Sequence, residues 1–510
     1  MKTNKINIAL FCFSFLGVVS CTDLEIEQTD SRFTNLTGEF TGVDPAQTLT
    51  NLYNSVRSQV ENQENIYALN EVATDEFVVP TRGTDWGDNG VWRTLHSHTW
   101  DANHQRVKNT WNDQNQNVYN ATTIIDSRSN GSPAEVAEAK FLRAYSMFWL
   151  IDLYGQVPFR NIDDAPDVLP MVMSRADAFD FAVKDLEEAI PNLEDKGPNG
   201  GLDRAGKAAA RLLLAKYYLN KHIFTGSGSP AAEDMTKVVQ LVDDIQDQGY
   251  ALHDGYFDIF TSAADNETIF FTTGSVGNRM WNGLHYNQNS PDNTGGGWNG
   301  FSTIAEFYDL FEGDPNTNVP GSGQEERRGF VPTDGSHLGI GYGFLIGQQY
   351  DANGNKMKDR PGNDLIFTKE LPGLLGNDER DGIRVIKWHP ENGAFAGHEI
   401  VMRYADAHLM KVEAIFNGGS SSEDALTLMN ELRTIRKATP LSSLSAQDII
   451  DERGRELYGE SWRRNDLIRF GQFISPWSYK EVTGDETKNL FPIPATAIIS
   501  NPNLIQNPGY

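Results

Sequence analysis

The sequence predicts a mostly α-helical fold in which two helical stretches frame a loop-rich, strand-poor segment. Ser132-Pro133-x-Glu135 has the pattern of a capping box with proline at the first helical position, and the apolar run behind it ends at Gly155, a C-terminal cap residue. Similar periodicity recurs before and after this helix, whereas Gly, Asn and Asp are dense at about 250–400. Helices are expected over residues 44–62, 103–127, 132–155, 175–193, 204–223, 233–247, 403–417, 423–438 and 445–459.

Three of these helices look loosely alike. Segments 137–150, 206–219 and 403–416 each carry alanines early, a leucine midway and an aromatic residue late. This pattern resembles the first helix of a tetratricopeptide repeat, although long insertions break the repeat period of about 34 residues. The sequence therefore predicts a tetratricopeptide-like helical-repeat core, with unrelated amphipathic helices in one bundle as the alternative.

The middle segment, about 250–400, is expected to hold the binding loops. Thr268-Ile269-Phe270-Phe271 indicates a strand, and residues 351–355 (Asp-Ala-Asn-Gly-Asn) indicate a hairpin turn. Those oxygen-rich residues could also contact Ca²⁺, but Gly362 stands where the closing glutamate of an EF-hand would be. No cofactor or metal is therefore expected. Long loops on a rigid scaffold are where binding sites usually lie.

The N-terminus has the features of a lipoprotein signal peptide over residues 1–20. Lys2 and Lys5 precede an apolar run of about 15 residues, shorter than the ~20 needed to span a bilayer. The run ends in Gly-Val-Val-Ser-Cys21, which resembles a bacterial lipobox. Acyl chains such as palmitate on Cys21 would anchor the protein to a membrane. The other cysteine, Cys12, lies in the segment that is removed, so no disulfide is expected.

The charge of the chain limits its partners. Without Lys2 and Lys5, 41 basic residues oppose 70 acidic ones, a net charge of about −29. Such a surface repels phosphate backbones and anionic headgroups, so nucleic acid is excluded as a partner and the lipid must do the anchoring. Residues 21–43 read as an acidic tether. Asp23, Glu25 and Glu27 in it resemble the export signal of surface lipoproteins of the Bacteroidetes.

Several longer motifs together resemble the SusD/RagB family of outer-membrane lipoproteins. The C-terminal half carries an alanine-rich helix at 404–416, its partner helix at 424–433, and the run from Asp451-Glu452-Arg453 to Arg469-Phe470-Gly471. The endings Leu-Phe-Pro-Ile-Pro at 490–494 and Gln-Asn-Pro-Gly-Tyr at 506–510 match as well, and so do residues 139–144 and 153–158.

The resemblance implies one SusD-like domain over 44–510. Its helical core would comprise 44–249 and 401–471, its ligand-binding insertion about 250–400, and its tail 472–510. It also implies a surface-exposed, lipid-anchored protein that passes an oligosaccharide to a SusC-type TonB-dependent transporter. A RagB-like peptide-binding protein is the alternative, and a lipid-anchored glycoside hydrolase is a third hypothesis from another class.

Two loop segments have the composition of a sugar-binding site, because aromatic faces suit the C–H side of pyranose rings while charged and amide groups suit hydroxyls. Arg82, Asp85, Trp86 and Asn89 form the first segment, which resembles the family's platform loop. Trp281, Tyr286 and Trp298 mark the second. Trp86 is the expected platform, whereas Trp92 and Trp100 fit a core equally well and Trp298 fits either a binding finger or a turn.

Catalytic motifs do not stand out. The sequence has no HExxH, P-loop, nucleophile elbow or Rossmann fingerprint. Charged residues at 452–466 could form an acid–base set, but arginine forks pair well with carboxylates, so ion pairs that tie the last helices to the body are the preferred interpretation. A glycosidase would show no such motif, because its two carboxylates can come from anywhere in the chain. It is the resemblance to the SusD/RagB family that implies a binding protein without catalytic residues.

Overall fold

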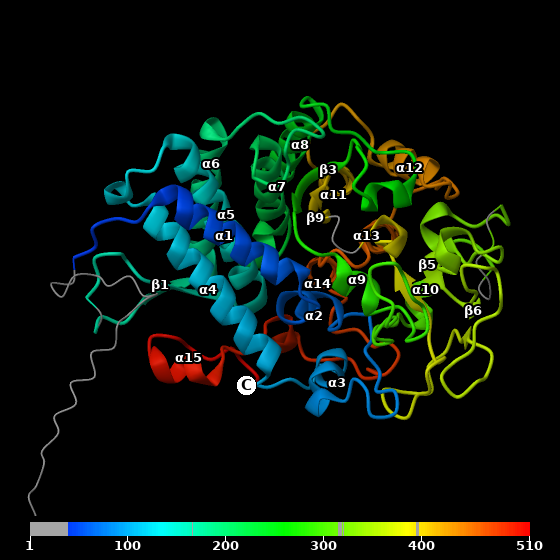
Figure 1. Cartoon of the computed structure of the whole chain (residues 1–510). Helices are drawn as coiled ribbons and strands as arrows, with labels where there is room; N and C mark the ends of the chain where they lie inside the picture. The colour runs from blue at the N-terminus through cyan, green and yellow to red at the C-terminus, as the bar shows by residue number, and fades with distance from the viewer. Residues whose placement is uncertain (1–38, 166, 315–318, 320, 394–396) are drawn as a thin grey trace, which may run out of the picture. The chain divides into compact units, whose positions relative to one another are not determined.

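Helices packed one on the next form one side of the protein, and loops with short strands form the other (Figure 1). The computed structural model describes residues 39–510 except 166, 315–318, 320 and 394–396. Cys21, the signal segment 1–20 and residues 21–38 of the tether lie outside the described residues. The helices are α1 (Pro45–Glu61), α2 (Asn65–Glu71), α3 (Val91–His96), α4 (Gln105–Ile125), α5 (Pro133–Tyr154), α6 (Arg175–Ala189), α7 (Lys207–Phe224), α8 (Ala232–Gln246), α9 (Gly277–Trp281), α10 (Ala305–Tyr308), α11 (Tyr404–Phe416), α12 (Ala425–Ile435), α13 (Ala446–Leu457), α14 (Arg463–Arg469) and α15 (Ala495–Ser500).

The long helices begin and end where their caps predict. Ser132 and Glu135 form the capping box of α5, and Gly155 ends that helix in the left-handed conformation at φ 70°. Asp44 caps α1 and Ser445 caps α13. The nine helices expected from the sequence are confirmed, with ends that differ by a few residues at most.

The helical stack has the order of a repeat rather than that of a closed bundle. Helix α4 packs on α5, α5 on α6, α6 on α7, α7 on α8, and the chain returns after the loop-rich segment so that α11 packs on α8 and α12 on α11. Packing chiefly between neighbours is what helical repeats show. The predicted tetratricopeptide-like core is therefore confirmed. Within the described residues, no helix combines the length and the apolar character that a bilayer crossing requires.

Strands are few and short, as predicted. An antiparallel ribbon joins β1 (Gln156–Phe159) to β2 (Met171–Ser174), and β3 (Thr268–Thr272) pairs with β9 (Glu399–Arg403). In the loop-rich part, β4 (Gly329–Phe330), β5 (Tyr342–Leu345) and β8 (Arg384–Ile386) form a three-stranded sheet, and β6 (Gly347–Gln348) pairs with β7 (Ile366–Phe367). The expected turn at 351–355 is present, because the Asp351 carboxylate accepts the backbone N–H groups of Asn353 and Asn355.

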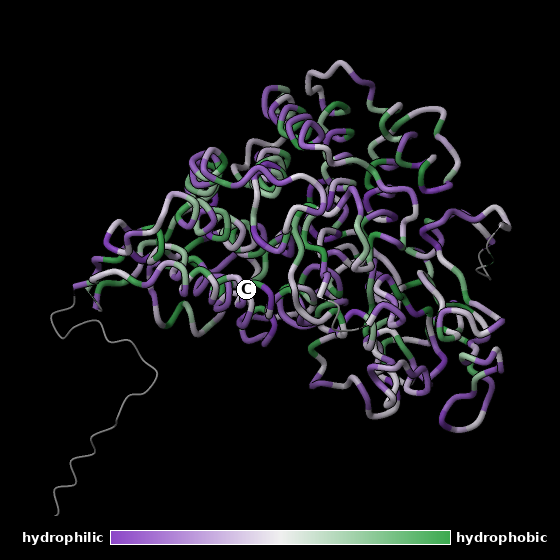
Figure 2. Tube along the Cα trace, turned by 45° about the horizontal axis from the view of Figure 1, so that its top comes forward, coloured by the Kyte–Doolittle hydropathy of each residue, from purple (hydrophilic) through white to green (hydrophobic). Residues whose placement is uncertain are grey.

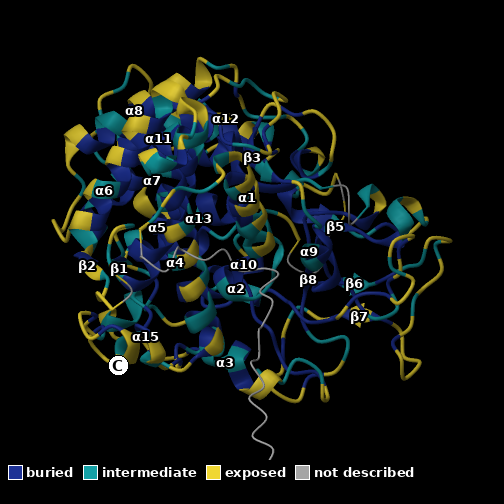
Figure 3. Ribbon diagram, turned by 60° about the vertical axis from the view of Figure 1, so that its left-hand side comes forward, coloured by how far each residue is buried: buried dark blue, intermediate teal, exposed yellow. Residues whose placement is uncertain are grey.

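One hydrophobic core runs from the helical stack into the loop-rich part, and exposed residues gather on the outer helix faces and the loop tips (Figure 3). Hydrophilic stretches follow the outer loops (Figure 2). Loops this long keep a defined path because their bases are buried in the same core as the helices.

A buried network of ion pairs joins the loop-rich part to the last helices. Glu456 of α13 accepts hydrogen bonds from Arg327 at 3.0 Å, Arg403 at 2.7 Å and Arg436 at 3.0 Å, and all four side chains are fully buried. The charged residues of the 452–466 run are likewise paired: Glu452 with Arg455, Arg453 with Asp406 and Asp466, and Arg464 with Asp152. The structural interpretation of this run is confirmed.

Candidate functional site

The two loop segments selected from the sequence meet in the folded chain. Trp86 Nε1 donates a hydrogen bond to the carbonyl oxygen of Trp298, 212 residues away, at 2.8 Å. The Tyr286 hydroxyl donates to the Asp85 carboxylate, 201 residues away, at 2.5 Å. Neither segment could form the site alone, because each supplies the partner that orients the aromatic ring of the other.

Trp86 is held by rings and by a glycine. It is half-buried, and its ring lies 5.8 Å from that of Trp92 and 5.7 Å from that of Phe301, measured between centroids. A Cβ atom at Gly300 would lie 2.3 Å from two atoms of the Trp86 ring. Gly300 therefore allows the chain to pass directly against the indole, and only glycine fits there.

Backbone strain gathers where the two segments touch. Trp86, Asp88, Asn89 and Asn299 adopt left-handed conformations with φ of 61°, 36°, 53° and 51°. Asparagine and aspartate tolerate this region, but for a bulky residue such as tryptophan it is a genuine outlier. Such strain persists only where the surroundings impose it, and it concentrates at binding and catalytic sites.

A third loop contributes Arg360, which the sequence analysis missed. Its guanidinium carbon lies 3.8 Å from the centroid of the Tyr286 ring, a close cation–π stack. The same guanidinium pairs with Glu379 and lies 3.6 Å from Asp85. A signal was present in the sequence, because Asp-x-x-Gly-Asn occurs at both 351–355 and 359–363, and Arg360 lies inside the second turn.

Protonation states in this cluster follow from its contacts. Burial lowers the pKa of His285 to about 4, so the ring is neutral at pH 7. Its Nδ1 accepts the Asn287 N–H, so its Nε2 carries the proton and donates to Glu379 at 3.0 Å. Burial opposes ionisation of Glu379, but hydrogen bonds from Arg360 hold its pKa below the usual value. Burial and the Asp85 carboxylate raise the pKa of Tyr286, which keeps its hydroxyl as a donor.

Arg82 and Trp281 lie inside the protein rather than on its surface. Arg82 is 3% exposed, and its guanidinium donates to the carbonyls of Asn299, Gly300 and Asp381 at 2.7–3.0 Å. Burial lowers the pKa of Arg82 to about 10, which still leaves it charged at pH 7. Trp281 is 7% exposed. The structure gives both residues a supporting place under the loops, and ligand contact through them stays a prediction.

The remaining predicted residues reach the surface. Asp85 and Tyr286 are half-buried like Trp86, Trp298 is 37% exposed, and Asn89 is exposed on the turn that follows Trp86. Trp92 and Trp100 are core residues, with 1% and 3% exposure. We use the term loop surface for Asp85, Trp86, Tyr286, Trp298 and Arg360. It offers aromatic faces beside a guanidinium and a carboxylate, the groups that bind apolar sugar faces and hydroxyls.

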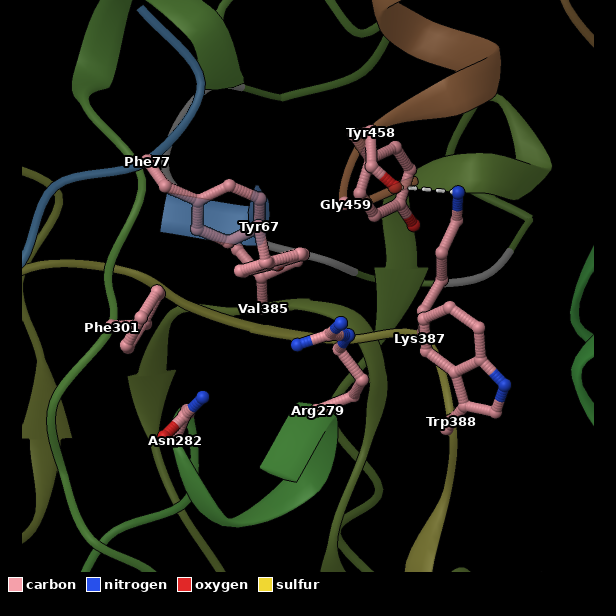
Figure 4. Close-up of a pocket in the computed structure, with 11 residues that line it drawn as sticks. Tyr67, Phe77, Arg279, Asn282, Phe301, Val385, Lys387, Trp388, Tyr458 and Gly459 are labelled. Atoms are coloured by element: carbon pink, nitrogen blue, oxygen red, sulfur yellow. Dashed lines mark hydrogen bonds between the residues drawn. The ribbon is translucent and has the colours of Figure 1, made fainter. Parts of the chain in front are cut away.

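A small cavity that shares Phe301 with the support of Trp86 has too little room for a sugar. It is lined by Tyr67, Arg279, Phe301 and Lys387 among others, and Lys387 Nζ donates to the Tyr458 carbonyl at 2.6 Å (Figure 4). Its volume is about 20 Å³, which corresponds to one or two water molecules. A larger open groove of about 290 Å³ lies between α4 and the β1–β2 ribbon, lined by Tyr119, Pro158, Phe159 and Pro170. Among the described residues that line this groove, Arg160 is the one that carries a charge, whereas the loop surface has both a guanidinium and a carboxylate.

Comparison with known proteins agrees with this architecture. Two family models match: one described as "SusD family" over residues 384–510, and one described as "Starch-binding associating with outer membrane" over 25–219. The chain is 26% identical to the starch-binding protein SusD of Bacteroides thetaiotaomicron over the full length of both chains.

Solved structures share the fold. A SusD-like protein from Bacteroides fragilis superposes with a TM-score of 0.68 at 20% identity, covering 91% of this chain and 96% of that one. A laminarin-binding SusD-like protein superposes with a TM-score of 0.65 at 21% identity, covering 92% of this chain and all of the other. The helical stack with its loop-rich part is therefore a SusD-like fold. The matching family models at both ends of the chain agree with the SusD-like resemblance that the sequence motifs predicted.

Proposed function

We propose that this protein captures an oligosaccharide on the loop surface without changing it chemically. One observation carries the proposal: three loops far apart in the sequence come together in the fold. Trp86, in a left-handed conformation, is hydrogen-bonded to the Trp298 carbonyl, while its neighbour Asp85 is hydrogen-bonded to Tyr286, on which Arg360 stacks. The names of the relatives support the ligand class, since they describe starch-binding and laminarin-binding proteins. A glycosidase needs a carboxylic acid with a raised pKa as proton donor, whereas the pKa of Glu379, beside the loop surface, is shifted downward. Burial raises the pKa of Glu71 to about 8 and that of Glu399 to about 7, but both side chains lie in the interior of the protein.

We further propose that the protein works at the outer face of the outer membrane, anchored through Cys21, and passes its ligand to a SusC-type TonB-dependent transporter. The lipobox-like sequence before Cys21 supports the anchor. A matching family model is described as associating with the outer membrane, which supports the location. The match to the SusD family model over residues 384–510 supports the partner.

The unanchored Cys21→Ala protein is expected to bind at least one oligosaccharide of a glycan panel and to release no product from it. The panel would include starch, laminarin and xyloglucan oligosaccharides, with calorimetry for affinity and chromatography of the glycan after long incubation. We expect a Kd between about micromolar and millimolar, because a protein that delivers its ligand must also release it. A mixture of short peptides serves as the comparison. Peptide capture without glycan capture would favour the RagB-like function instead, and cleavage of a glycan would rule out a pure binding role.

The Cys21→Ala substitution is also expected to move the folded protein from the membrane to the soluble fraction. Each buried methylene of an acyl chain contributes about 0.8 kcal/mol to membrane affinity, and the acidic chain offers no electrostatic substitute. Fractionation would be done in cells that lack a SusC-type transporter, because a protein partner could retain the variant. Variant protein that still sediments with outer membranes in those cells would show that Cys21 is not the anchor.

A further inference from the structure

We infer that the loop surface selects uncharged glycans and discriminates against glycans that carry carboxylate or sulfate groups. This inference rests on the proposed function and concerns the chemical class of its ligand. It follows from the state of the charged groups in the three segments that build the surface, residues 81–90, 282–300 and 358–381.

Acidic residues outnumber basic ones in these segments. Nine aspartates and glutamates face five arginines and lysines, and His285 is neutral at pH 7 because burial lowers its pKa. The acidic residues are Asp85, Asp88, Asp292, Asp359, Asp364, Glu370, Asp378, Glu379 and Asp381. A polyanionic chain that approaches this surface therefore meets an excess of like charge, in addition to that of the whole protein.

Each basic side chain of the three segments already has partners within the protein. Arg360 pairs with Glu379 and lies 3.6 Å from Asp85, and Arg380 pairs with Asp378 at 2.8 Å and Asp359 at 3.4 Å. The two lysines pair with carboxylates as well, Lys358 with Asp364 and Lys369 with Asp309.

The fifth basic residue, Arg82, is buried and donates to carbonyl groups. A sulfate or uronate group would therefore have to displace a carboxylate that already neutralises the cation before it gained the full attraction of an unpaired charge. Hydroxyl groups need no such exchange, because they can donate to the carboxylates and accept from the guanidinium of Arg360 in its present pairing. The surface can thus bind a neutral sugar without breaking its own ion pairs. For an anion, none of the three segments, which the structure describes in full, contains an unpaired cation.

The test compares one glycan with its own derivatives. The neutral glycan that the Cys21→Ala protein binds in the panel would be measured again after carboxymethylation, and after hydroxyethylation to the same degree as an uncharged control for bulk. We expect the carboxymethylated form to bind at least about tenfold more weakly than the hydroxyethylated form at low salt, with the difference shrinking at high salt because like-charge repulsion is screened.

A matched pair of variants assigns the discrimination to these loops. Asp378 is exposed and pairs with Arg380, so Asp378→Asn removes a carboxylate and leaves Arg380 more available. Asp244 on α8 is a comparable exposed carboxylate, which pairs with Arg211 on α7 within the helical stack, and Asp244→Asn removes its charge. We expect the penalty on the carboxymethylated glycan to fall in Asp378→Asn and to stay unchanged in Asp244→Asn.

Three outcomes would contradict the proposals, and they are distinguishable. Equal or tighter binding of the carboxymethylated glycan would overturn the inference and leave the proposed function in place. Equal responses of the two variants would overturn the assignment of discrimination to these loops. Failure to bind any glycan, neutral or charged, would overturn the proposed function itself.

Discussion

Replacing Glu456 by glutamine is expected to lower the free energy of unfolding by about 3–5 kcal/mol, because it removes one partner of a fully buried ionic network and leaves buried charge uncompensated. Three arginines share this carboxylate, and the pKa of Glu456 is held far below its usual value by Arg436, Arg403 and Arg327 in spite of its burial. Urea denaturation would measure the change. Glu188→Gln is the control, since Glu188 pairs with Lys140 at the surface, where such pairs contribute about 1 kcal/mol or less.

Acid unfolding of the unaltered protein checks the buried ion pairs when the variant is too unstable to purify, both in the network of Glu456, which shares Arg327 with Glu452, and in the separate cluster of Asp466. Burial opposes ionisation, yet Arg327 and its neighbours hold the pKa of Glu452 at about 2, and Arg453 and its neighbours hold that of Asp466 at about 2. Since these folded-state pKa values lie below the unfolded ones of about 4, the stabilisation is complete above pH 5 and is lost as the pH falls toward 2. A melting temperature that does not fall between pH 5 and pH 3, or equal effects of Glu456→Gln and Glu188→Gln, would contradict this role.

Replacing Trp86 by alanine is expected to weaken glycan binding by about thirtyfold, the ~2 kcal/mol that a central aromatic anchor contributes. Because Trp86 is half-buried against Trp92 and Phe301, the variant will also lose some stability. Gly300→Ala separates the loss of binding from the loss of stability. It keeps the indole of Trp86, but the added Cβ atom would displace the ring from its present position. Binding would be measured by calorimetry and stability by thermal denaturation, on both variants and on Trp92→Ala.

Trp92→Ala is the matched core control. Its side chain is 1% exposed, so we expect a stability loss of about 3–5 kcal/mol. Trp298→Ala tests the neighbouring loop, and its 37% exposure predicts weaker binding with an unchanged melting temperature. If Trp86→Ala and Gly300→Ala both retained full affinity, the loop surface would not be the site. The groove lined by Tyr119, Pro158, Phe159 and Pro170 would then be the next candidate.

The helices were predictable because their signals are local. The capping box at Ser132, the glycine at 155 and the periodic apolar residues between them determine where α5 begins and ends, independently of the rest of the chain. The pairing of the charged residues at 452–466 was also predictable, because guanidinium and carboxylate groups in a buried helix need partners. Which partners they take, such as Arg327 and Arg403 for Glu456, depends on contacts over long sequence distances.

The candidate site was predictable by composition and not by geometry. Aromatic, Asn-rich loops identified Trp86, Tyr286 and Trp298, but nothing near Trp86 in the sequence shows that Phe301 and Gly300 support its ring. Arg82 was predicted to contact the ligand because it lies near Trp86 in the sequence and a guanidinium group suits hydroxyls. The fold buries it instead, and it donates hydrogen bonds to three carbonyl groups. Arg360 was missed because its partner Tyr286 lies in a different loop, and only tertiary structure brings them together.

The way Arg82 and Arg384 hold the loops has a consequence for how the protein can change over time. Both guanidinium groups donate hydrogen bonds to main-chain carbonyl oxygens, among them those of Gly300, Glu379 and Asp381. A carbonyl group is present at each position whatever side chain the residue carries. Mutations that exchange the side chains at positions 286, 298 or 360 therefore leave these hydrogen bonds from Arg82 and Arg384 intact. New ligand preferences can arise by single substitutions on a loop frame that is inherited unchanged, so recognition and folding can evolve separately.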